Sequence, residues 1–337
     1  MKVLHTPIEI AGQLGLSVKG LREVGINSDS LVYKNPFGYK NDFYFEFFES
    51  QEKRRQSRRE KLNFLNENYD VVHYSFGTPI LNDYEDVEFF LKENKKVIVE
   101  FWGSEVRLNQ LESQRNKYYV PKDKIPDSKK IELMKKWAEY TKGHVIFSDH
   151  TFNEYLQPYF NKIHIVGQRV DTKKLLPIYP SLYSKRLKVL HAPSHQGFKG
   201  TKYVTNAVES LKARGYDFEF LLVENKTNVE ALELYKQADI IIDQLCGGAH
   251  GVFACEAMAL GKPVICYISP EWVDGYPEGF PIINANPDTI EEVLAYWLEA
   301  SPEERYQLGV KSRNYAEDVH DIEVVAKKLK TVYENFL

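Results

Sequence analysis

One stretch constrains the fold more than any other: residues 239–268, which read DIIIDQLCGGAHGVFACEAMALGKPVICYI. An apolar run from Ile240 to Asp243 predicts a strand, a turn with three glycines follows, and an apolar helix ends near Gly261. A second apolar strand begins at Pro263. This order of strand, loop, helix and strand is typical of a parallel α/β domain. Free amides and the helix dipole favour negative charge in the loop after such a strand, which predicts a phosphate-bearing ligand.

Strands and helices alternate in the same way along the rest of the chain. The sequence predicts the α/β class, with two Rossmann-like domains facing across a cleft. The expected parts are an N-terminal domain (1–171), a connection (172–186), a second domain (187–318) and a C-terminal helix (319–337) that packs back on the first domain.

Three helix starts are expected from capping-box spacing, in which a side chain and a glutamate three residues later bond each other's backbone amide. They lie at Thr227, Asp288 and Ser301.

Composition excludes several classes of protein. The 337 residues carry a formal net charge of −4, which does not favour nucleic acid as a partner. The three cysteines lack CxxC spacing, so neither a disulfide framework nor a zinc framework is expected. A protein of the reducing cytoplasm is expected instead. The N-terminus does not resemble a signal peptide, and no apolar run approaches the roughly 18 residues of a membrane span.

Residues 43–61 combine aromatic and basic side chains at helical spacing. One interpretation is a solvated surface helix whose aromatic end is packed. The other is a peripheral contact with an anionic membrane at the inner face, where each basic residue adds about 1 kcal/mol.

The glycines near the N-terminus do not have the spacing of a dinucleotide fingerprint. Gly12, Gly15 and Gly20 depart from GxGxxG, so a nicotinamide cofactor is not expected. Gly12 would still let a ligand approach the backbone closely.

Polar residues follow the buried-looking strands at 71–77 and 95–107. His73, Glu105 and Arg107 are therefore candidates for acceptor or sugar contacts. The alternatives are that His73 is a satisfied histidine at a strand end and that Glu105 and Arg107 pair with each other.

A second candidate phosphate site follows the strand that begins at residue 187. Its loop carries Ser194 and His195, and GFKGT then places Lys199 near the start of a helix. Hydroxyl and amide donors, a positive charge and close backbone approach are what a diphosphate requires. The alternative is an ordinary exposed lysine.

Three motifs, HAPSHQGFKGT, YKQADIIIDQ and GVFACEAMALGKPVICY, carry a resemblance to a known family. They resemble the donor-binding domain of the retaining, nucleotide-sugar-dependent glycosyltransferases of the GT-B fold, the large group 1 or family 4 class, in its bacterial form. The likeness covers about residues 186–270 and extends more loosely to WGSEVR and MKVLHTPIEIAG in the first domain.

The resemblance implies a role for each matching residue. Glu256 would bind the ribose hydroxyls, Lys199 the diphosphate, and the amides of Gly251 and Val252 the phosphates or sugar. The remaining donor-side candidates are Gly12, Ser194, His195, Gln196, Gly248 and His250. Those on the acceptor side are His73, Trp102, Glu105 and Arg107, and the catalytic candidates are Lys199, Glu256 and Glu105.

The chain departs from the family pattern at several positions. Gly248 stands where members commonly carry a first glutamate, so His250 or the backbone would have to replace that sugar contact. Trp102 stands where many carry a histidine, and Ser194, His195 and Gln196 occupy the loop that often holds an arginine. The strand and turn that usually contact the base are not evident between Val223 and Tyr235.

The expected reaction is transfer of a sugar, with retention, from a nucleoside diphosphate sugar to a hydroxyl of a saccharide or lipid-linked acceptor. Such a reaction would belong to polysaccharide or glycoconjugate synthesis. The chain has no DxD motif, so neither a cofactor nor a metal at the phosphates is expected. Two alternatives stay open: a sugar-nucleotide epimerase, and a non-catalytic nucleotide-sugar-binding partner of an active transferase.

Overall fold

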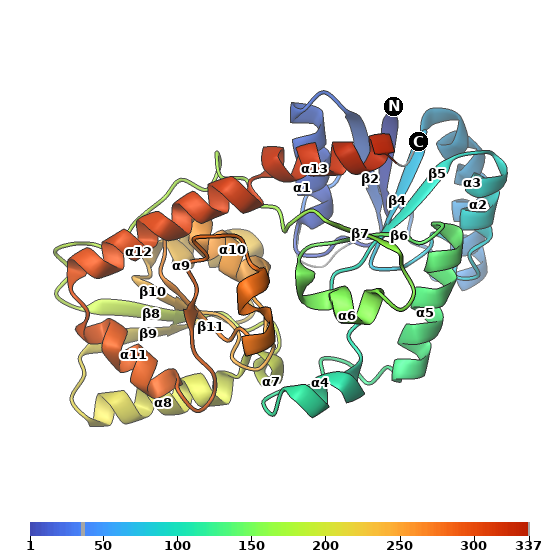
Figure 1. Ribbon diagram of the computed structural model, residues 1–337. Helices are drawn as coiled ribbons and strands as arrows, with labels where there is room; N and C mark the ends of the chain where they lie inside the picture. The colour runs from blue at the N-terminus through green and yellow to red at the C-terminus, as the bar shows by residue number, and fades with distance from the viewer. Residues whose placement is uncertain (35–37, 336–337) are drawn as a thin grey trace. The chain divides into compact units, whose positions relative to one another are not determined.

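The computed structural model describes residues 1–34 and 38–335 (Figure 1). The chain forms two compact units. Unit 1 comprises residues 1–108, 125–169 and 322–337, and unit 2 comprises residues 109–124 and 170–321. Each unit is built around its own parallel sheet with helices on both faces. The α/β class and the two Rossmann-like domains predicted from the sequence are confirmed.

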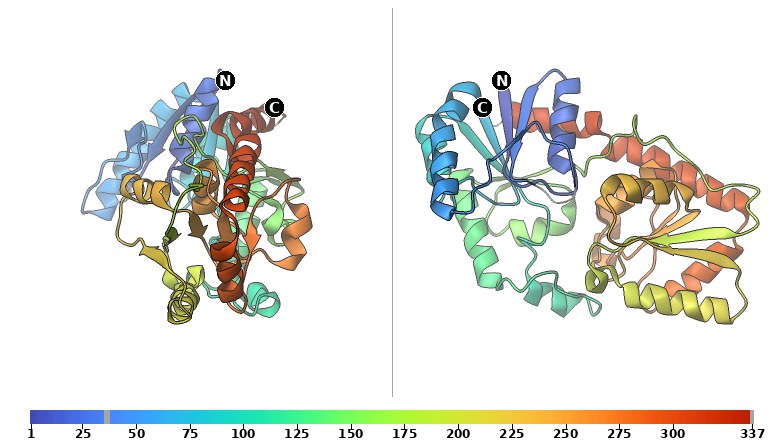
Figure 2. Two further views of the ribbon diagram at one scale, coloured as in Figure 1. Left: turned by 90° about the vertical axis from the view of Figure 1, so that its left-hand side faces the viewer. Right: turned by 180° about the vertical axis from the view of Figure 1, so that it is seen from behind.

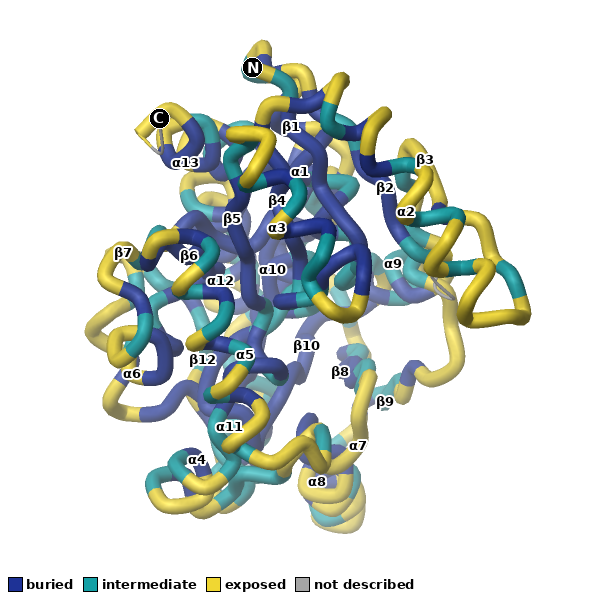
Figure 3. The backbone as a smooth tube through the Cα atoms, turned by 90° about the vertical axis from the view of Figure 1, so that its right-hand side faces the viewer, coloured by how far each residue is buried: buried dark blue, intermediate teal, exposed yellow. Residues whose placement is uncertain are grey.

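Unit 1 contains a seven-stranded sheet in the order β3-β2-β1-β4-β5-β6-β7. Its strands are β1 (Lys2–Thr6), β2 (Asn27–Val32), β3 (Phe43–Tyr44), β4 (Val71–Ser75), β5 (Lys96–Glu100), β6 (His144–Phe147) and β7 (Lys162–Ile165). The strand order reverses between β1 and β4, which places the loops after these two strands side by side at a topological switch point. Figure 3 shows β1, β4 and β5 as buried strands.

The helices of unit 1 cover both faces of this sheet. They are α1 (Gln13–Glu23), α2 (Gln51–Asn68), α3 (Glu85–Lys92), α5 (Asp127–Tyr140), the short turns η1 (His150–Phe152) and α6 (Asn153–Leu156), and α13 (Ile322–Asn335). The C-terminal helix α13 lies against α1 (Figures 1 and 2). A Cβ at Gly20 of α1 would lie 2.4 Å from the Ile322 carbonyl oxygen, so the two helices approach closely because this residue is glycine.

Unit 2 contains a five-stranded sheet in the order β12-β11-β10-β8-β9. Its strands are β8 (Leu187–His191), β9 (Phe218–Leu222), β10 (Ile240–Ile242), β11 (Val264–Cys266) and β12 (Ile283–Asn284). Alternate residues of β10 join different cores: Ile241 packs in one cluster, and Ile240 and Ile242 pack in another. An all-apolar run is what a strand buried on both faces requires.

The helices of unit 2 follow its strands in the expected alternation. They are α4 (Asn109–Arg115), α7 (Gln196–Lys199), α8 (Thr201–Ala213), α9 (Asn228–Gln237), α10 (Val252–Ala259), η2 (Pro270–Gly275), α11 (Ile290–Glu299), α12 (Pro302–Tyr315) and the π-helical turn η3 (Ala316–His320). All three cysteines are buried, and none of them forms a disulfide. Among the described residues, no helix is both long and apolar enough to cross a bilayer.

The division into units differs from the expected boundaries at residues 109–124, which belong to unit 2 and not to the N-terminal domain. The reason is a set of specific contacts. The buried Asn116 side chain donates to the Cys246 carbonyl (3.0 Å), and Lys117 Nζ lies 2.7 Å from an Asp288 carboxylate oxygen. The expected connection 172–186 also packs on unit 2, where the Ile178 amide donates to the Leu260 carbonyl (2.9 Å).

Candidate functional site

The loops after β8 and β10 meet in unit 2 because these two strands are neighbours in the sheet. Lys199 is only 6 % exposed, and its ammonium forms an ion pair with one carboxylate oxygen of Asp243, which is fully buried. The other oxygen of Asp243 accepts the amide of Gly251 (3.4 Å). The predicted lysine and the predicted glycine turn therefore converge on one buried carboxylate.

His191 holds the two loops in place at the end of β8. Its Nδ1 lies 2.9 Å from the Ile242 carbonyl oxygen and its Nε2 lies 3.0 Å from the Thr201 hydroxyl. Burial lowers the pKa of His191 to about 4, so the ring is neutral at physiological pH. A neutral ring donates at one nitrogen and accepts at the other, which matches a carbonyl on one side and a hydroxyl on the other.

Glu256 lies in the second turn of α10, and its Oε1 accepts a hydrogen bond from the Asn228 amide at the start of α9 (3.1 Å). Its pKa is raised from 4.5 to about 7, mainly by burial; the Asn228 hydrogen bond lowers it and the nearby Asp243 carboxylate raises it. Because the folded-state pKa is above the unfolded value, ionising Glu256 costs stability as pH rises between these two values. A ligand hydroxyl that donates to the carboxylate would offset this cost.

The exposed side chains of Ser194, His195 and Gln196 lie before Lys199. His195 caps the short helix α7, since its Nδ1 accepts the Phe198 amide (3.1 Å). Gln196 donates to a carboxylate oxygen of Glu224 (2.6 Å).

Gly248 has a left-handed backbone conformation with φ of 72°. A Cβ there would lie 2.5 Å from the Ser269 hydroxyl oxygen and 3.1 Å from the Trp272 ring. The space that a side chain at this position would need is filled by two other side chains. A glutamate at this position, as is common in the resembled family, would therefore force Ser269 and Trp272 to shift.

His250 lies in the loop before α10 and is 4 % exposed. Its ring packs against Tyr276, Phe280 and His320, with centroid distances of 5.2, 5.6 and 5.5 Å. Val252 is the first residue of α10, and Gly251 is its N-cap.

In unit 1, Gly12 is the N-cap of α1. The amides of Leu14 and Gly15 in the first turn donate to the two carboxylate oxygens of Glu9 (3.2 and 3.1 Å). The chain's own carboxylate therefore occupies part of the anion-binding end of α1. Burial raises the pKa of Glu9, and these hydrogen bonds lower it by a smaller amount.

His73 is 1 % exposed and lies within a buried polar network, not at a surface where an acceptor could reach it. Its Nδ1 lies 2.7 Å from the Tyr333 hydroxyl of α13, and its Nε2 lies 3.2 Å from a carboxylate oxygen of Glu100. Arg169 pairs with both oxygens of Glu100 (2.6 and 3.1 Å). Of the two interpretations of His73, its burial and these contacts favour a core histidine, and the acceptor contact stays a prediction.

Trp102 and Glu105 lie together in the turn after β5. The Trp102 indole donates to the Ser75 hydroxyl (3.0 Å), and its backbone amide donates to Glu105 Oε1. Glu105 is 5 % exposed, and burial raises its pKa to about 7. Arg107 is also buried, and its guanidinium lies 4.8 Å from the centre of the Phe152 ring.

No protein family and no curated protein matches the sequence. Solved structures do match over nearly the whole chain. Sucrose-phosphate synthase from Thermosynechococcus elongatus has a TM-score of 0.70 at 14 % identity, covering 99 % of this chain and 98 % of its own. A glycosyltransferase from Rickettsia africae has a TM-score of 0.69 at 14 % identity with the same coverage. Anabaena HepE in complex with UDP-glucose has a TM-score of 0.64 at 10 % identity, covering 99 % and 100 %.

The chain has the GT-B fold. At these identities the likeness shows the fold alone, and it agrees with the resemblance found in the sequence.

Two site residues were missed by sequence reasoning. The apolar run predicts Asp243 only as the end of a strand, although an acidic residue directly after three isoleucines at a ligand-binding edge is a usable signal. Asn228 contacts Glu256 from a helix 28 positions earlier in the chain, and no sequence pattern connects the two.

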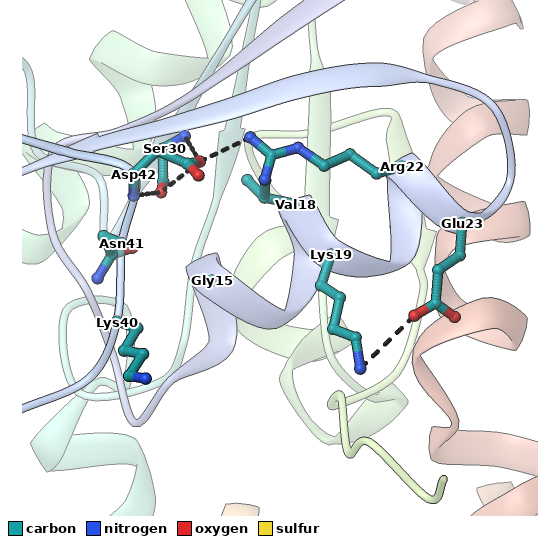
Figure 4. A pocket seen from close by; sticks show the side chains of 9 residues that line it. All are labelled: Gly15, Val18, Lys19, Arg22, Glu23, Ser30, Lys40, Asn41 and Asp42. Carbon is teal, nitrogen blue, oxygen red and sulfur yellow. Dashed lines mark hydrogen bonds and ion pairs between the residues drawn. The ribbon is translucent and has the colours of Figure 1, made fainter. Parts of the chain in front are cut away.

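A pocket of about 440 Å³ lies beside α1 in unit 1 and contains none of the predicted site residues (Figure 4). Its charged side chains largely pair within the unit. Arg22 contacts Asp42 (3.0 Å) and Asp29 (2.8 Å), and Lys19 contacts Glu23 (3.5 Å). A second pocket of about 570 Å³ lies in unit 2 beside β12 and α11.

Proposed function

We propose that the protein is a glycosyltransferase that moves a sugar from a nucleoside diphosphate sugar to an acceptor hydroxyl, with retention and without a metal at the diphosphate. The observation that carries the proposal is the convergence of Lys199, Asp243 and the Gly251 amide at the start of α10, with Glu256 one turn further along. The fold supports it, since HepE of the same fold is described in complex with UDP-glucose.

On the donor side, the residues of unit 2 would stabilise the charge that develops on the leaving diphosphate. Lys199 supplies the positive charge, and Asp243 holds its ammonium in place. The helix-start amides of α10 supply further donors. Glu256 would accept from two adjacent ribose hydroxyls, which a carboxylate does in its ionised form.

On the acceptor side, the turn after β5 supplies the chemistry in this proposal. Glu105 has a pKa near 7, which suits proton exchange with an acceptor hydroxyl at neutral pH. Trp102 lies in the same turn, with the Arg169 guanidinium over its ring at 5.1 Å from the centroid. The acceptor class is a saccharide or a lipid-linked sugar, in polysaccharide or glycoconjugate synthesis.

A nucleotide screen followed by a transfer assay tests the proposal. A nucleoside diphosphate that binds the folded state should raise the melting temperature, by an amount that corresponds to about 2.7 kcal/mol at 100 times its Kd. The matching nucleotide sugar should then release its diphosphate only in the presence of an acceptor. Conversion of the donor without acceptor would instead show an epimerase, and binding without transfer to any acceptor would show a non-catalytic partner.

We also propose that the protein acts in the cytoplasm and that residues 43–61 contact the inner membrane face. Phe47 is 73 % exposed there, whereas Arg55 and Arg59 pair with Asp83 and Glu85. The paired arginines contribute less to an electrostatic attraction than their number indicates, so the aromatic ring should carry more of the binding.

Vesicle co-sedimentation tests this contact. Wild-type protein should sediment with anionic vesicles and less with zwitterionic ones, and Phe47→Ser should weaken the binding. Equal sedimentation with both kinds of vesicle would refute the electrostatic attraction to anionic lipid, and no sedimentation with either would refute the membrane contact.

A further inference from the structure

Three metal-ligating side chains meet in the interior of unit 2. His250, Cys255 and His320 each offer one ligand atom, and these atoms all lie within 4.8 Å of one another. The exposed fractions of the three residues are 4, 0 and 3 %. Within residues 1–34 and 38–335, no other group of three or more histidine, cysteine or acidic side chains has spacing suited to a metal ion.

The three residues come from three different backbone elements. His250 belongs to the loop before α10, and Cys255 lies one turn into α10, where its amide donates to the Gly251 carbonyl (3.2 Å). His320 ends the π-helical turn η3, and its carbonyl accepts the amide of Val170 (2.8 Å). π-Helical turns are rare and occur frequently at functional sites.

The surroundings of His250 resemble those of a metal-bound histidine. Its Nδ1 lies 3.3 Å from the Tyr276 hydroxyl, an interaction that fixes the ring and assigns Nε2 as the ligand atom. Tyr276 stacks on Phe280 with a centroid distance of 4.0 Å, and Tyr315 lies 5.6 Å from the ring of His320. These aromatic rings form an apolar wall that would limit exchange of a bound ion with solvent.

We propose that His250, Cys255 and His320 bind one transition-metal ion of the zinc class. Two imidazoles and a thiolate suit Zn²⁺ or Co²⁺, whereas Mg²⁺ and Ca²⁺ prefer oxygen ligands. Tetrahedral Zn²⁺ holds such ligand atoms about 3.3–3.6 Å apart, so the separations within the cluster must shorten by up to about 1.5 Å, which side-chain torsions supply. A water molecule takes the fourth position, and Cys255 releases its thiol proton to solvent on binding.

The cysteine spacing does not predict a zinc framework, and the absence of a DxD motif does not predict a metal at the donor diphosphate. This site is a different one, because it combines a single cysteine with two histidines from separate elements. Here the ion connects two parts of unit 2. One part is α10, which carries Glu256, with the loop before it, and the other is the last residues of the unit before α13. Its role is therefore structural, and no step of the proposed sugar transfer passes through it. The inference does not depend on the proposed function.

Metal titration of the purified full-length chain tests the proposal. After treatment with a chelator, the protein should bind one equivalent of Zn²⁺ in competition with a chromophoric chelator, and Zn²⁺ should raise its melting temperature. Co²⁺ should give a thiolate-to-cobalt charge-transfer band, because Cys255 coordinates as the thiolate.

Matched variants identify the ligands. Cys255→Ser should abolish the charge-transfer band, and both it and His320→Gln should weaken Zn²⁺ binding by on the order of 100-fold or more. Cys246→Ser and Cys266→Ser change the other two buried thiols and should leave binding intact. Circular dichroism would establish that each variant is folded.

Several outcomes would overturn the proposal. One is the absence of saturable Zn²⁺ binding at micromolar concentrations by the wild-type chain, a result that does not depend on any variant folding. Another is a charge-transfer band that survives Cys255→Ser. A third is loss of binding in His164→Gln, which would assign the metal to the pair of His144 and His164, whose ring nitrogens lie 3.1 Å apart.

Discussion

Variants of the ion pair between Lys199 and Asp243 can distinguish the contribution of Lys199 to folding stability from its contribution to sugar transfer. The two side chains are 7 and 0 % exposed. Lys199→Met removes the cation and leaves the Asp243 carboxylate buried without it, which should lower the free energy of unfolding by about 3–5 kcal/mol. Lys199→Met combined with Asp243→Asn removes both charges and should recover at least half of that loss, because a buried neutral pair has a smaller desolvation cost.

Activity should not recover with stability. If Lys199 stabilises the leaving diphosphate, the single and the double variant should both lose about 100- to 1000-fold in turnover, or about 2.7–4 kcal/mol at the transition state. Lys202→Met is the matched control, because Lys202 is an exposed lysine three residues further along the chain, in the first turn of α8. It should retain both stability and turnover.

Urea unfolding and initial rates of transfer at saturating donor provide the two measurements. A double variant that regains stability and turnover together would show that Lys199 acts only through the fold. A single variant as stable as the wild type would refute the ion-pair argument itself.

Three further predictions follow from the site and the core. Glu256→Gln should abolish the fall in stability between pH 4.5 and 7. Urea unfolding should therefore show the variant to be about 1–3 kcal/mol more stable than the wild type at pH 8, and no more stable at pH 4. Gly248→Glu should cost about 1–3 kcal/mol and bring no gain in transfer rate, because its Cβ would clash with Ser269 in a left-handed backbone; a stable, faster variant would contradict this packing. Tyr333→Phe should lower the free energy of unfolding by about 1–2 kcal/mol, since His73 Nδ1 loses its 2.7 Å partner, and unchanged thermal unfolding would contradict that role.

Local sequence patterns predicted local structure well where both partners lie within one helix turn. The capping boxes at Thr227 and Ser301 are both formed, with Glu230 and Glu304 as partners. The one expected at Asp288 is wrong. This carboxylate bonds Lys117 and Tyr118 instead, and the helix begins at Ile290. The contact with Lys117, which lies 171 positions away in the sequence, replaces the expected cap, and a local sequence pattern cannot predict it.

In the candidate site, too, features set by local sequence were predicted and those set by long-range contacts were not. Lys199, Gly251 and Glu256 were found from their places after strands and in family-like motifs, because a parallel sheet gathers such loops at one edge. His73 was placed at that edge by the same argument, yet it packs against Tyr333, which lies 260 positions away. Strand position alone does not tell whether a polar side chain at a strand end reaches solvent or a buried partner.

The sequence by itself determined the two α/β domains, strands such as those at 71–75, 187–191 and 240–242, and the glycine turn of residues 247–251, because apolar runs and turn residues act over short distances. Only the tertiary structure decided that Asp243 holds Lys199, that Ser269 and Trp272 fill the space beside Gly248, and that His250, Cys255 and His320 meet. It also assigned residues 109–124 to unit 2. These features depend on side chains brought together from distant parts of the chain, and their charge, volume and burial are properties of the packed interior.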